Sequence, residues 1–217
     1  FLRAALTADG RKVHCFTSPH LVRFNERIRL AGQLISDDAL AHYLSRALDV
    51  AHGIEPSFFE ITTASAFLAF SDHPADAAIV EVGLGGRLDA TNIMPGAAVT
   101  TIATLGIDHQ AFLGTSIEQI AAEKAGIARS GTPLVTLAYP DVVRRVIHTC
   151  ASATGARLIE RGHHWDATAT PDALHYSDAA GTLTTPPPSL NGPHQATNLA
   201  LAIATLRHQR AIPVSTQ

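Results

Sequence analysis

The segment from Glu81 to Asn92, Glu-Val-Gly-Leu-Gly-Gly-Arg-Leu-Asp-Ala-Thr-Asn, constrains the fold more than any other part of the chain. The apolar run 77–80 before it predicts a buried strand, which the glycines after Glu81 bring to an end. Because glycine lets backbone N–H groups approach a ligand closely, this loop indicates a binding site beyond the carboxyl end of the strand. We expect the Glu81 carboxylate to be buried there, and therefore to be paired or to hold a metal. The alternative is a turn that only reverses the chain, since Gly-x-Gly-Gly is not the dinucleotide-binding fingerprint.

The composition excludes several classes of protein. At 217 residues, the chain is long enough to bury a sizeable core. Its net charge of −3 and its 16% of charged residues give no basic surface for nucleic acid. No apolar run approaches the roughly 20 residues that span a bilayer, so we expect no membrane partner. The two cysteines, Cys15 and Cys150, cannot form a disulfide framework, which favours a reducing, cytoplasmic location.

The first residues indicate a fragment of a longer protein. They lack an initiator Met and a signal peptide, and they begin inside a predicted helix. Only two lysines occur, Lys12 and Lys124, against fourteen arginines. Neither lysine completes a Gly-x-x-x-x-Gly-Lys-Ser/Thr loop, so a phosphate-binding loop of that type is absent from these residues.

Apolar segments alternate with amphipathic ones along the first 160 residues. The pattern predicts strands at 13–16, 77–82, 97–103, 133–138 and 156–160, and helices at 1–9, 36–52, 58–70, 116–129 and 140–153. A hairpin around 178–181 and a final helix after the turn at 190–195 follow. Continuous apolar strands between such helices predict an α/β fold, with a mostly parallel sheet and helices on both of its faces.

Lys124 lies on the apolar face of the helix predicted after Ser116. Ser116 and Gln119 fit a capping box that starts this helix. Ile117 and Ile120 precede Lys124 by seven and four residues, which places all three on one face. An inward lysine is costly when charged, and its neutral amine reacts with carbon dioxide to give a carbamate, a metal-binding anion. The alternative is a packed stem with the ammonium group in water.

Two further polar loops follow predicted strands. His109 comes after the strand at 97–103, where it can ligate a metal or donate to an oxyanion. Ser18 follows the strand at 13–16. Because the carboxyl ends of parallel strands share one edge of a sheet, we expect Ser18, Glu81 and His109 to converge. A hydroxyl, a carboxylate and an imidazole, together with water, suit Mg²⁺ with phosphate nearby.

Five motifs follow one another in a specific order along the chain. They are Thr-Ser-Pro-His-Leu-Val-Arg-Phe-Asn-Glu-Arg-Ile-Arg (17–29), Phe-Phe-Glu-Ile-Thr-Thr (58–63), the segment 81–92, Gly-Ile-Asp-His (106–109) and Ala-Ala-Glu-Lys-Ala-Gly-Ile (121–127). Together they closely resemble the folylpolyglutamate synthase and dihydrofolate synthase family, over residues 1 to about 210. This family belongs to the Mur ligase superfamily of ATP-dependent enzymes that form amide bonds.

The resemblance implies that residues 1–217 form a Mur ligase central domain, which is P-loop NTPase-like and binds ATP, truncated at both ends. The phosphate-loop segment and the carboxy-terminal ligase domain would lie outside it. In the complete enzyme, ATP would phosphorylate a carboxylate of dihydropteroate or folate, and the amino group of glutamate would then form the amide. Mg²⁺ would offset the charge of the reactants. This reaction belongs to folate biosynthesis and one-carbon metabolism, and we expect the fragment alone to be inactive.

The same motifs imply roles for particular residues. Ser18, Glu81 and His109 resemble the magnesium ligands of the family. Lys124 resembles the lysine that is carbamylated in the superfamily, and Lys124 and His109 are the expected catalytic residues. The (dihydro)pteroate pocket is expected at Ser57, Phe59, Leu88, Asp89 and Ala90, and Asn198 is expected near the nucleotide base.

Other functions remain open at this point. One is a peptidoglycan or cyanophycin ligase of the same superfamily, although the Arg-Leu-Asp-Ala-Thr-Asn run favours folate. A second is a nucleotide-binding module without chemistry. A dinucleotide-dependent dehydrogenase is disfavoured, because no Gly-x-Gly-x-x-Gly follows a strand. The expected partners are small molecules (dihydropteroate or folate, glutamate and ATP) bound by a monomer, and the sequence does not distinguish dihydrofolate synthase from folylpolyglutamate synthase.

Overall fold

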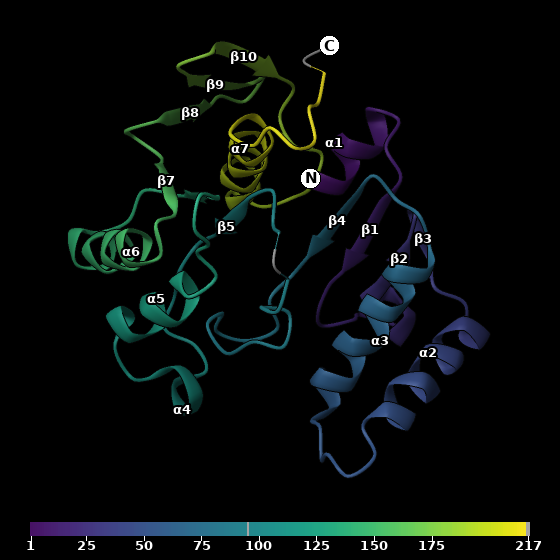
Figure 1. Cartoon of the computed structure of the whole chain (residues 1–217). Helices are drawn as coiled ribbons and strands as arrows, with labels where there is room; N and C mark the ends of the chain where they lie inside the picture. The colour runs from purple at the N-terminus through teal and green to yellow at the C-terminus, as the bar shows by residue number, and fades with distance from the viewer. Residues whose placement is uncertain (95, 216–217) are drawn as a thin grey trace. The chain divides into compact units, whose positions relative to one another are not determined.

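The computed structural model describes residues 1–94 and 96–215 (Figure 1). The chain forms two compact units. The N-terminal unit comprises residues 2–84 and 88–94, and the C-terminal unit comprises residue 1, residues 85–87 and the described residues from 96 onward. The two units share no sheet, and each is described by itself.

The N-terminal unit is built on a four-stranded sheet. Its elements are α1 (Leu2–Ala8), β1 (Val13–Phe16), the 3-10 helix η1 (Phe24–Arg27), β2 (Ile28–Leu30), β3 (Gln33–Leu34), α2 (Asp37–Val50), α3 (Phe58–Asp72) and β4 (Ala77–Val80). The strand order is β3-β2-β1-β4. Strands β1 and β4 are parallel, with Phe16 opposite Val80, whereas β2 and β3 pair in antiparallel fashion. The last residues of β1 and β4 therefore lie side by side at one edge of the sheet.

The core of this unit lies between the sheet and the helices α2 and α3. Helix α2 begins where the Ser36 side chain accepts a hydrogen bond from the Ala39 N–H at 3.2 Å, and acidic Asp37 and Asp38 favour its first turn. The buried residues that join sheet and helices are Phe16, Ile28, Ile35, Tyr43, Ala66 and Ala69. They come from both strands and helices, so α2 and α3 cover one face of this sheet.

The C-terminal unit contains two three-stranded sheets. Its elements are β5 (Thr100–Ile102), α4 (Gln110–Leu113), α5 (Ile117–Ala125), β6 (Pro133–Thr136), α6 (Asp141–Thr154), β7 (Arg157–Glu160), β8 (Trp165–Ala169), β9 (Leu174–Asp178), β10 (Gly181–Thr185) and α7 (His194–Arg207). One sheet has the order β5-β6-β7 and is wholly parallel. The other has the order β10-β9-β8 and is wholly antiparallel.

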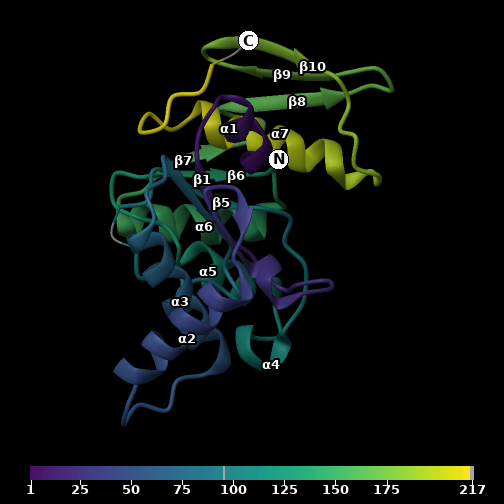
Figure 2. The ribbon, with the colours of Figure 1, turned by 90° about the vertical axis from the view of Figure 1, so that its right-hand side faces the viewer.

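The parallel sheet of the C-terminal unit is covered on both faces. Neighbouring residues of a strand point to opposite faces, and in β6 Leu134 belongs to one core cluster while Val135 belongs to another. The Leu134 side packs against α5 and α6, and the Val135 side packs against α7 and the antiparallel sheet. Figure 2 shows α7 between the two sheets. Helix α6 ends at Gly155, which adopts a left-handed conformation with φ 70°.

The predicted α/β class, with parallel strands and intervening helices, is confirmed. The predicted hairpin around 178–181 is also present, as β9 and β10. The structure adds antiparallel strands that the pattern did not predict, namely β2, β3 and β8. Three predicted strands are shorter than expected, since β4 ends at Val80, β5 spans only Thr100–Ile102 and β6 ends at Thr136. Among the described residues, no helix is both long enough and apolar enough to cross a membrane.

Candidate ligand-binding loops

The loops that follow β1 and β4 meet at one edge of the N-terminal sheet. The Glu81 N–H donates to the carbonyl oxygen of Phe16 at 2.8 Å, which continues the parallel pairing one residue beyond the strands. The Ser18 N–H then donates to Oε2 of Glu81 at 3.1 Å. Ser18 precedes a cis peptide bond to Pro19. The structure therefore brings together two of the three predicted magnesium ligands, Ser18 and Glu81.

The expected burial of Glu81 is wrong, because its side chain is exposed. Strand β4 ends at Val80, so Glu81 lies just outside the sheet rather than within it. An exposed carboxylate bears little of the desolvation cost that a buried one would bear. Its Ser18 partner is a backbone N–H, and the remaining lone pairs of the carboxylate are available to a hard cation.

Glu26 holds the loop after Pro19 in place. Its carboxylate accepts the backbone N–H groups of Leu21 at 2.8 Å, Val22 at 3.1 Å and Arg23 at 2.8 Å. These hydrogen bonds, with that of Leu21 foremost, lower the pKa of Glu26. Sequence reasoning did not identify Glu26 as a residue that organises the site.

Asp89 organises the glycine-rich loop from within. Its Oδ2 accepts the N–H groups of Gly83 at 3.1 Å and Leu84 at 2.9 Å. Its Oδ1 accepts the N–H of Thr91 at 3.0 Å and also the Thr91 hydroxyl. Asp89 is 9% exposed, and both of its oxygens are bonded to its own loop. The structure thus assigns Asp89 a structural role, while its expected contact with substrate stays a prediction.

Phe59 packs directly against the same loop. A Cβ atom added to Gly83 would lie 2.2 Å from Cζ of the Phe59 ring, so only glycine fits at that position with the ring where it is. Ser57 begins α3 as its N-cap, and it forms a capping box with Glu60. Hydrogen bonds from the side chain and the backbone of Ser57 lower the pKa of Glu60. Phe59 and Asp89, both predicted pocket residues, therefore both contact Gly83.

The other predicted pocket residues differ in exposure. Leu88 is 78% exposed, whereas Ala90 is half-buried and Ser57 is exposed. All five predicted pocket residues belong to the N-terminal unit. Their contact with a pteroate remains a prediction.

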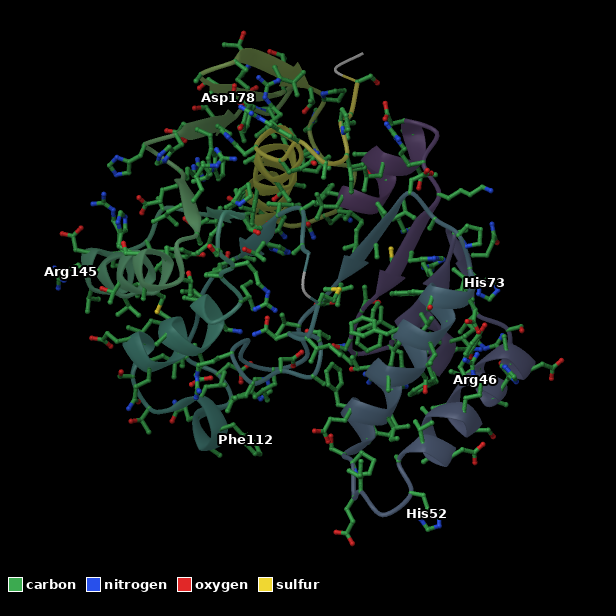
Figure 3. All side chains as sticks on the ribbon, in the orientation of Figure 1. Arg46, His52, His73, Phe112, Arg145 and Asp178 are labelled. Atoms are coloured by element: carbon green, nitrogen blue, oxygen red, sulfur yellow. The ribbon has the colours of Figure 1, made fainter. Side chains whose placement is uncertain are left out.

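His109 is an exposed residue at the start of α4, in the C-terminal unit. Its backbone adopts a left-handed conformation with φ 52°, which is uncommon outside glycine. The His109 N–H donates to Oδ1 of Asp108 at 2.7 Å, and Nε2 lies 3.6 Å from Oδ2 of the same carboxylate. Nearby Phe112 is 78% exposed (Figure 3). Because His109 lies in one unit and Ser18 and Glu81 in the other, the complete ligand set remains a prediction.

Lys124 lies in the last turn of α5, which ends at Ala125 and is therefore shorter than the predicted helix at 116–129. The capping box is confirmed, since the Ser116 hydroxyl accepts from the Gln119 N–H at 3.3 Å and Oε1 of Gln119 accepts from the Ser116 N–H at 3.2 Å. Ile120 is fully buried and Lys124 is half-buried. Within the described part of its own unit, the ammonium group has no hydrogen bond or ion pair. A half-buried lysine without a carboxylate partner fits both of the roles considered above, a reactive amine and a packed stem.

Arg87, in the glycine-rich loop, makes contacts that sequence reasoning missed. Its Nε and Nη2 donate to Oε1 of Glu123 at 3.0 and 2.8 Å, and its N–H donates to the Glu123 carbonyl oxygen at 2.8 Å. Arg87 and Glu123 are 36 positions apart. The available sequence signal was the presence of glycines on both sides of the contact, Gly86 and Gly126, which allow close approach of two backbones.

Asn198 lies in the first part of α7 and is half-buried. Its Nδ2 donates to Oε1 of Gln195 at 3.4 Å, which holds the amide near the start of the helix. The predicted neighbourhood of a nucleotide base is not tested by these contacts.

The parallel strands, their covering helices and the polar loops at strand ends define the class of protein. It is an α/β protein whose loops lie where such proteins bind ligands. Among proteins of known function, the dihydrofolate synthase/folylpolyglutamate synthase of Escherichia coli (strain K12) is 39% identical over 200 residues, which cover 92% of this chain and 47% of that protein. The Bacillus subtilis (strain 168) protein of the same name is 43% identical over 156 residues, covering 68% of this chain and 36% of the relative.

Solved structures agree with the sequence comparison. E. coli FolC in complex with DHPP and ADP superposes with a TM-score of 0.88 at 37% identity, over 100% of this chain and 50% of that one. The Yersinia pestis folylpolyglutamate synthase/dihydrofolate synthase complexed with AMPPNP and Mn gives a TM-score of 0.87 at 35% identity, over 99% and 50%. No protein-family model matches the chain.

The chain is a homologue of dihydrofolate synthase/folylpolyglutamate synthase over most of its length. It spans 47% and 36% of the two curated relatives named above.

Proposed function

We propose that residues 1–217 form the ATP-binding central domain of a dihydrofolate synthase/folylpolyglutamate synthase, a ligase that joins glutamate to dihydropteroate or folate. The observation that carries the proposal is the hydrogen bond from Ser18 to Glu81, because it joins two predicted magnesium ligands at one sheet edge. The E. coli structure with DHPP and ADP and the Y. pestis structure with AMPPNP and Mn support the same substrates and a divalent cation here.

The proposed reaction has two steps. A carboxylate oxygen of the pterin substrate attacks the γ-phosphorus of ATP, and the bond from that phosphorus to the β,γ-bridging oxygen breaks to release ADP. The amino group of glutamate then attacks the acyl carbon, and phosphate leaves with the former carboxylate oxygen. The amine loses one proton as the amide forms. Positioning and charge stabilisation supply most of the catalysis in such phosphoryl transfers.

The donor set fits a hard cation. Ser18 offers a hydroxyl, Glu81 a carboxylate and His109 an imidazole, and these three would hold Mg²⁺, which on binding would offset phosphate charge. The Ser18 N–H holds the Glu81 carboxylate next to the loop that follows β1. The Asp89 and Glu26 carboxylates accept hydrogen bonds from backbone N–H groups of the two loops and so help to hold the loop backbones in place.

Lys124 is proposed to act as a carbamate. Its neutral amine attacks the carbon of carbon dioxide, an N–C bond forms, one C–O electron pair moves to oxygen, and the amine loses one proton to water. The product is an anion in the last turn of α5. Ser57, Phe59, Leu88, Asp89 and Ala90 are proposed to line the pteroate pocket, and Asn198 to lie near the nucleotide base.

The proposed function also bears on the rest of the enzyme, its oligomeric state, its partners and its location. The phosphate loop and the carboxy-terminal ligase domain are proposed to lie outside these 217 residues, as the resemblance implies. The protein is proposed to act as a monomer on small molecules, without nucleic acid or membrane partners. The free thiols of Cys15 and Cys150 support a reducing, cytoplasmic location.

A hybrid enzyme tests the function. Residues 1–217 would replace the matching segment of the E. coli relative, so that the flanking segments come from a complete enzyme. We expect ADP release that requires Mg²⁺, glutamate and either dihydropteroate or folate. Lys124→Ala should lower kcat at least about 100-fold, whereas Lys12→Ala, at the only other lysine, should leave it unchanged.

The outcomes separate the alternatives. Turnover with dihydropteroate alone indicates a dihydrofolate synthase, and turnover with folate indicates a folylpolyglutamate synthase. A folded hybrid that binds nucleotide but releases no ADP with any substrate would leave a binding module and refute the ligase assignment. Turnover with other amino-acid acceptors would assign another Mur-type ligase.

A further inference from the structure

The last turn of α5 is held by the glycine-rich loop through its side chains. Arg87 donates twice to one oxygen of Glu123, from Nε at 3.0 Å and from Nη2 at 2.8 Å. Glu123 immediately precedes Lys124, and all of these residues belong to the C-terminal unit. The ion pair therefore acts on the residue next to the proposed reactive lysine.

The same turn is held through its backbone. The Arg87 N–H donates to the Glu123 carbonyl oxygen at 2.8 Å. A Cβ atom on Gly86 would lie 2.7 Å from the carbonyl oxygen of Glu123 and 2.9 Å from that of Lys124. A Cβ atom on Gly126 would lie 2.3 Å from Cβ and 2.6 Å from Cα of Arg87. The two segments are in van der Waals contact on both sides of Lys124, and only glycines permit it.

The exposure of the pair argues against a mainly stabilising role. The Arg87 side chain is 56% exposed and that of Glu123 is 25% exposed. Ion pairs of this exposure contribute little to folding stability, because water and salt screen them. Two hydrogen bonds from Nε and Nη2 of a planar guanidinium to one carboxylate oxygen nevertheless restrict the direction of the Glu123 side chain.

We propose that Arg87 is a positioning residue for Lys124, acting through Glu123 and through the close backbone approaches at Gly86 and Gly126. This inference rests on the proposed function, because it concerns the orientation of the lysine that would be carbamylated. With the turn fixed, the Lys124 side chain leaves the helix from one position and in one direction. Without Arg87, the turn can shift, and displacements on the scale of an ångström weaken reactions that depend on alignment.

The chain itself allows a direct test, because it contains only two lysines. ¹³C NMR of the 217-residue protein in ¹³C-bicarbonate would report a carbamate, assigned to Lys124 by its loss in Lys124→Arg and its retention in Lys12→Arg. We expect Arg87→Met to reduce this signal, because a Lys124 side chain that leaves the helix in more than one direction would hold the carbamate in fewer molecules. The charge-swapped pair Arg87→Glu with Glu123→Arg should recover part of it. Arg46→Met, which removes the Arg46–Asp72 ion pair of the other unit, is the matched control and should change nothing.

Two further measurements separate positioning from stability. Melting temperatures of all variants should stay within about 4 °C of the unmodified protein. In the hybrid enzyme, Arg87→Met should lower kcat and leave the KM for ATP within about twofold. A large fall in melting temperature would assign Arg87 to stability and overturn the proposal, as would an unchanged carbamate signal together with an unchanged kcat.

The carbamate signal and the turnover of the hybrid together distinguish a failure of this inference from a failure of the proposed function. A carbamate that depends on Arg87, in a hybrid without turnover, would support positioning and refute the ligase. Turnover in a hybrid whose Lys124 forms no carbamate, and whose kcat is indifferent to Arg87, would support the ligase and refute positioning.

Discussion

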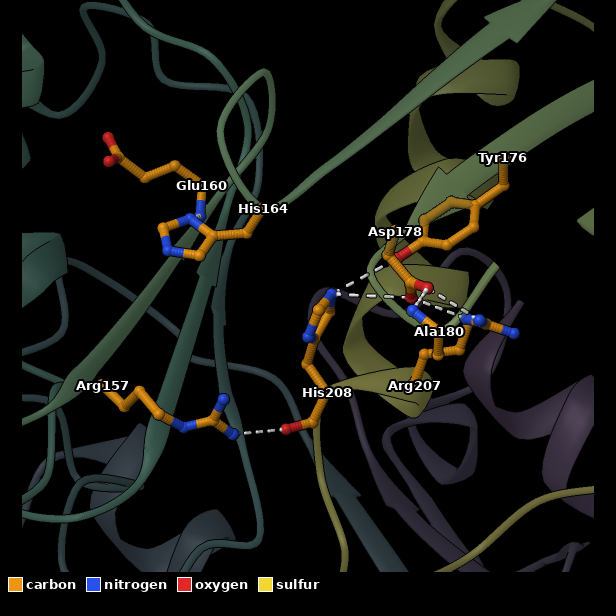
Figure 4. Close-up of polar contacts among 8 residues, drawn as sticks. All are labelled: Arg157, Glu160, His164, Tyr176, Asp178, Ala180, Arg207 and His208. Carbon is orange, nitrogen blue, oxygen red and sulfur yellow. Dashed lines mark hydrogen bonds and ion pairs between the residues drawn. The ribbon is translucent and has the colours of Figure 1, made fainter. Parts of the chain in front are cut away.

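The Asp178 carboxylate, at the end of β9, is bound at both oxygens by the Arg207 guanidinium in the last turn of α7 (Figure 4). Both N–O distances are 2.7 Å. The Tyr176 hydroxyl and the Ala180 N–H also donate to this carboxylate, and the Asp178 side chain is only 3% exposed. The hydrogen bonds from Arg207 lower the pKa of Asp178. The ion pair therefore connects the antiparallel sheet with α7 within the C-terminal unit.

Removing one partner of this pair should be costly. Arg207→Met leaves a buried carboxylate without its cation, and we expect the free energy of unfolding in urea to fall by about 3 kcal/mol. Arg23→Met breaks an ion pair with Asp37 whose side chains are 62% and 75% exposed, so its effect should be much smaller. Equal losses in the two variants would show that burial of the Asp178–Arg207 pair does not matter.

His208, which follows α7, should make stability depend on pH. Its Nε2 lies 3.4 Å from the Tyr176 hydroxyl and 3.8 Å from Asp178, and its carbonyl oxygen accepts a hydrogen bond from Arg157 at 2.8 Å (Figure 4). Burial lowers the pKa of His208 below its ordinary value of 6.5, against the attraction of Asp178. The folded chain thus binds fewer protons than the unfolded chain just below pH 6.5.

The sign of the effect follows from this difference in bound protons. The contribution of His208 is complete above pH 6.5 and is lost as the pH falls below that value. We expect the unfolding free energy to fall less steeply between about pH 7 and pH 5 in His208→Asn than in the unmodified protein. His163→Asn, at an exposed histidine, is the control. Parallel pH profiles for the protein and His208→Asn would contradict the assignment.

Local sequence patterns predicted the elements that have a clear local signal, such as an apolar run or a helix cap. Strand β1 has its predicted bounds, Val13–Phe16. All four of its residues are buried, and three of them are apolar, so the local pattern alone indicates a buried strand. The capping box at Ser116 correctly located the start of α5. Strands β2 and β3 escaped prediction, since they span three and two residues and exist through pairing with β1 and with each other. Strand β8 lies in a Thr- and Asp-rich segment that has the composition of a loop.

In the candidate site, too, local patterns were predictive, whereas contacts between distant positions were missed. Ser18 and Glu81 were predicted to share an edge because parallel strands end together, and they do. The exposure of Glu81 was not predictable from a pattern that placed the strand end two residues later than Val80. Contacts between distant positions were missed, such as Arg87 with Glu123, 36 positions apart, and Arg207 with Asp178, 29 apart. Such pairs depend on the folded path of the chain.

His14 should contribute to stability through hydrogen bonds rather than through its ring alone. Its Nε2 donates to the His73 carbonyl oxygen at 3.0 Å, and its Nδ1 accepts from the Ala31 N–H at 3.0 Å. The ring also stacks on Phe70 at 4.6 Å. His14→Phe keeps an aromatic ring but leaves both backbone groups unpaired, so we expect a loss of about 1–3 kcal/mol in urea unfolding. His163→Phe should have little effect, and a comparable loss there would contradict the argument.

The contact between Gly126 and Arg87 should not tolerate a methyl group. In Gly126→Ala, the new Cβ would meet the Arg87 backbone at 2.6 Å, so one of the two segments must move. We expect a loss of about 1–3 kcal/mol in stability, together with a lower kcat in the hybrid. Gly96→Ala adds a methyl group where nothing lies within 4 Å and is the matched control. Wild-type stability and kcat in Gly126→Ala would show that the contact is not restrictive.

The measurement that tests the ligase assignment most directly follows an oxygen atom. The hybrid enzyme would be supplied with ATP, Mg²⁺, glutamate and dihydropteroate whose carboxylate carries ¹⁸O, and the released phosphate would be examined by mass spectrometry. If the carboxylate is phosphorylated before glutamate attacks, each phosphate carries one oxygen from the substrate, and ¹⁸O appears in it. Phosphate free of ¹⁸O, released in step with ADP, would contradict the account.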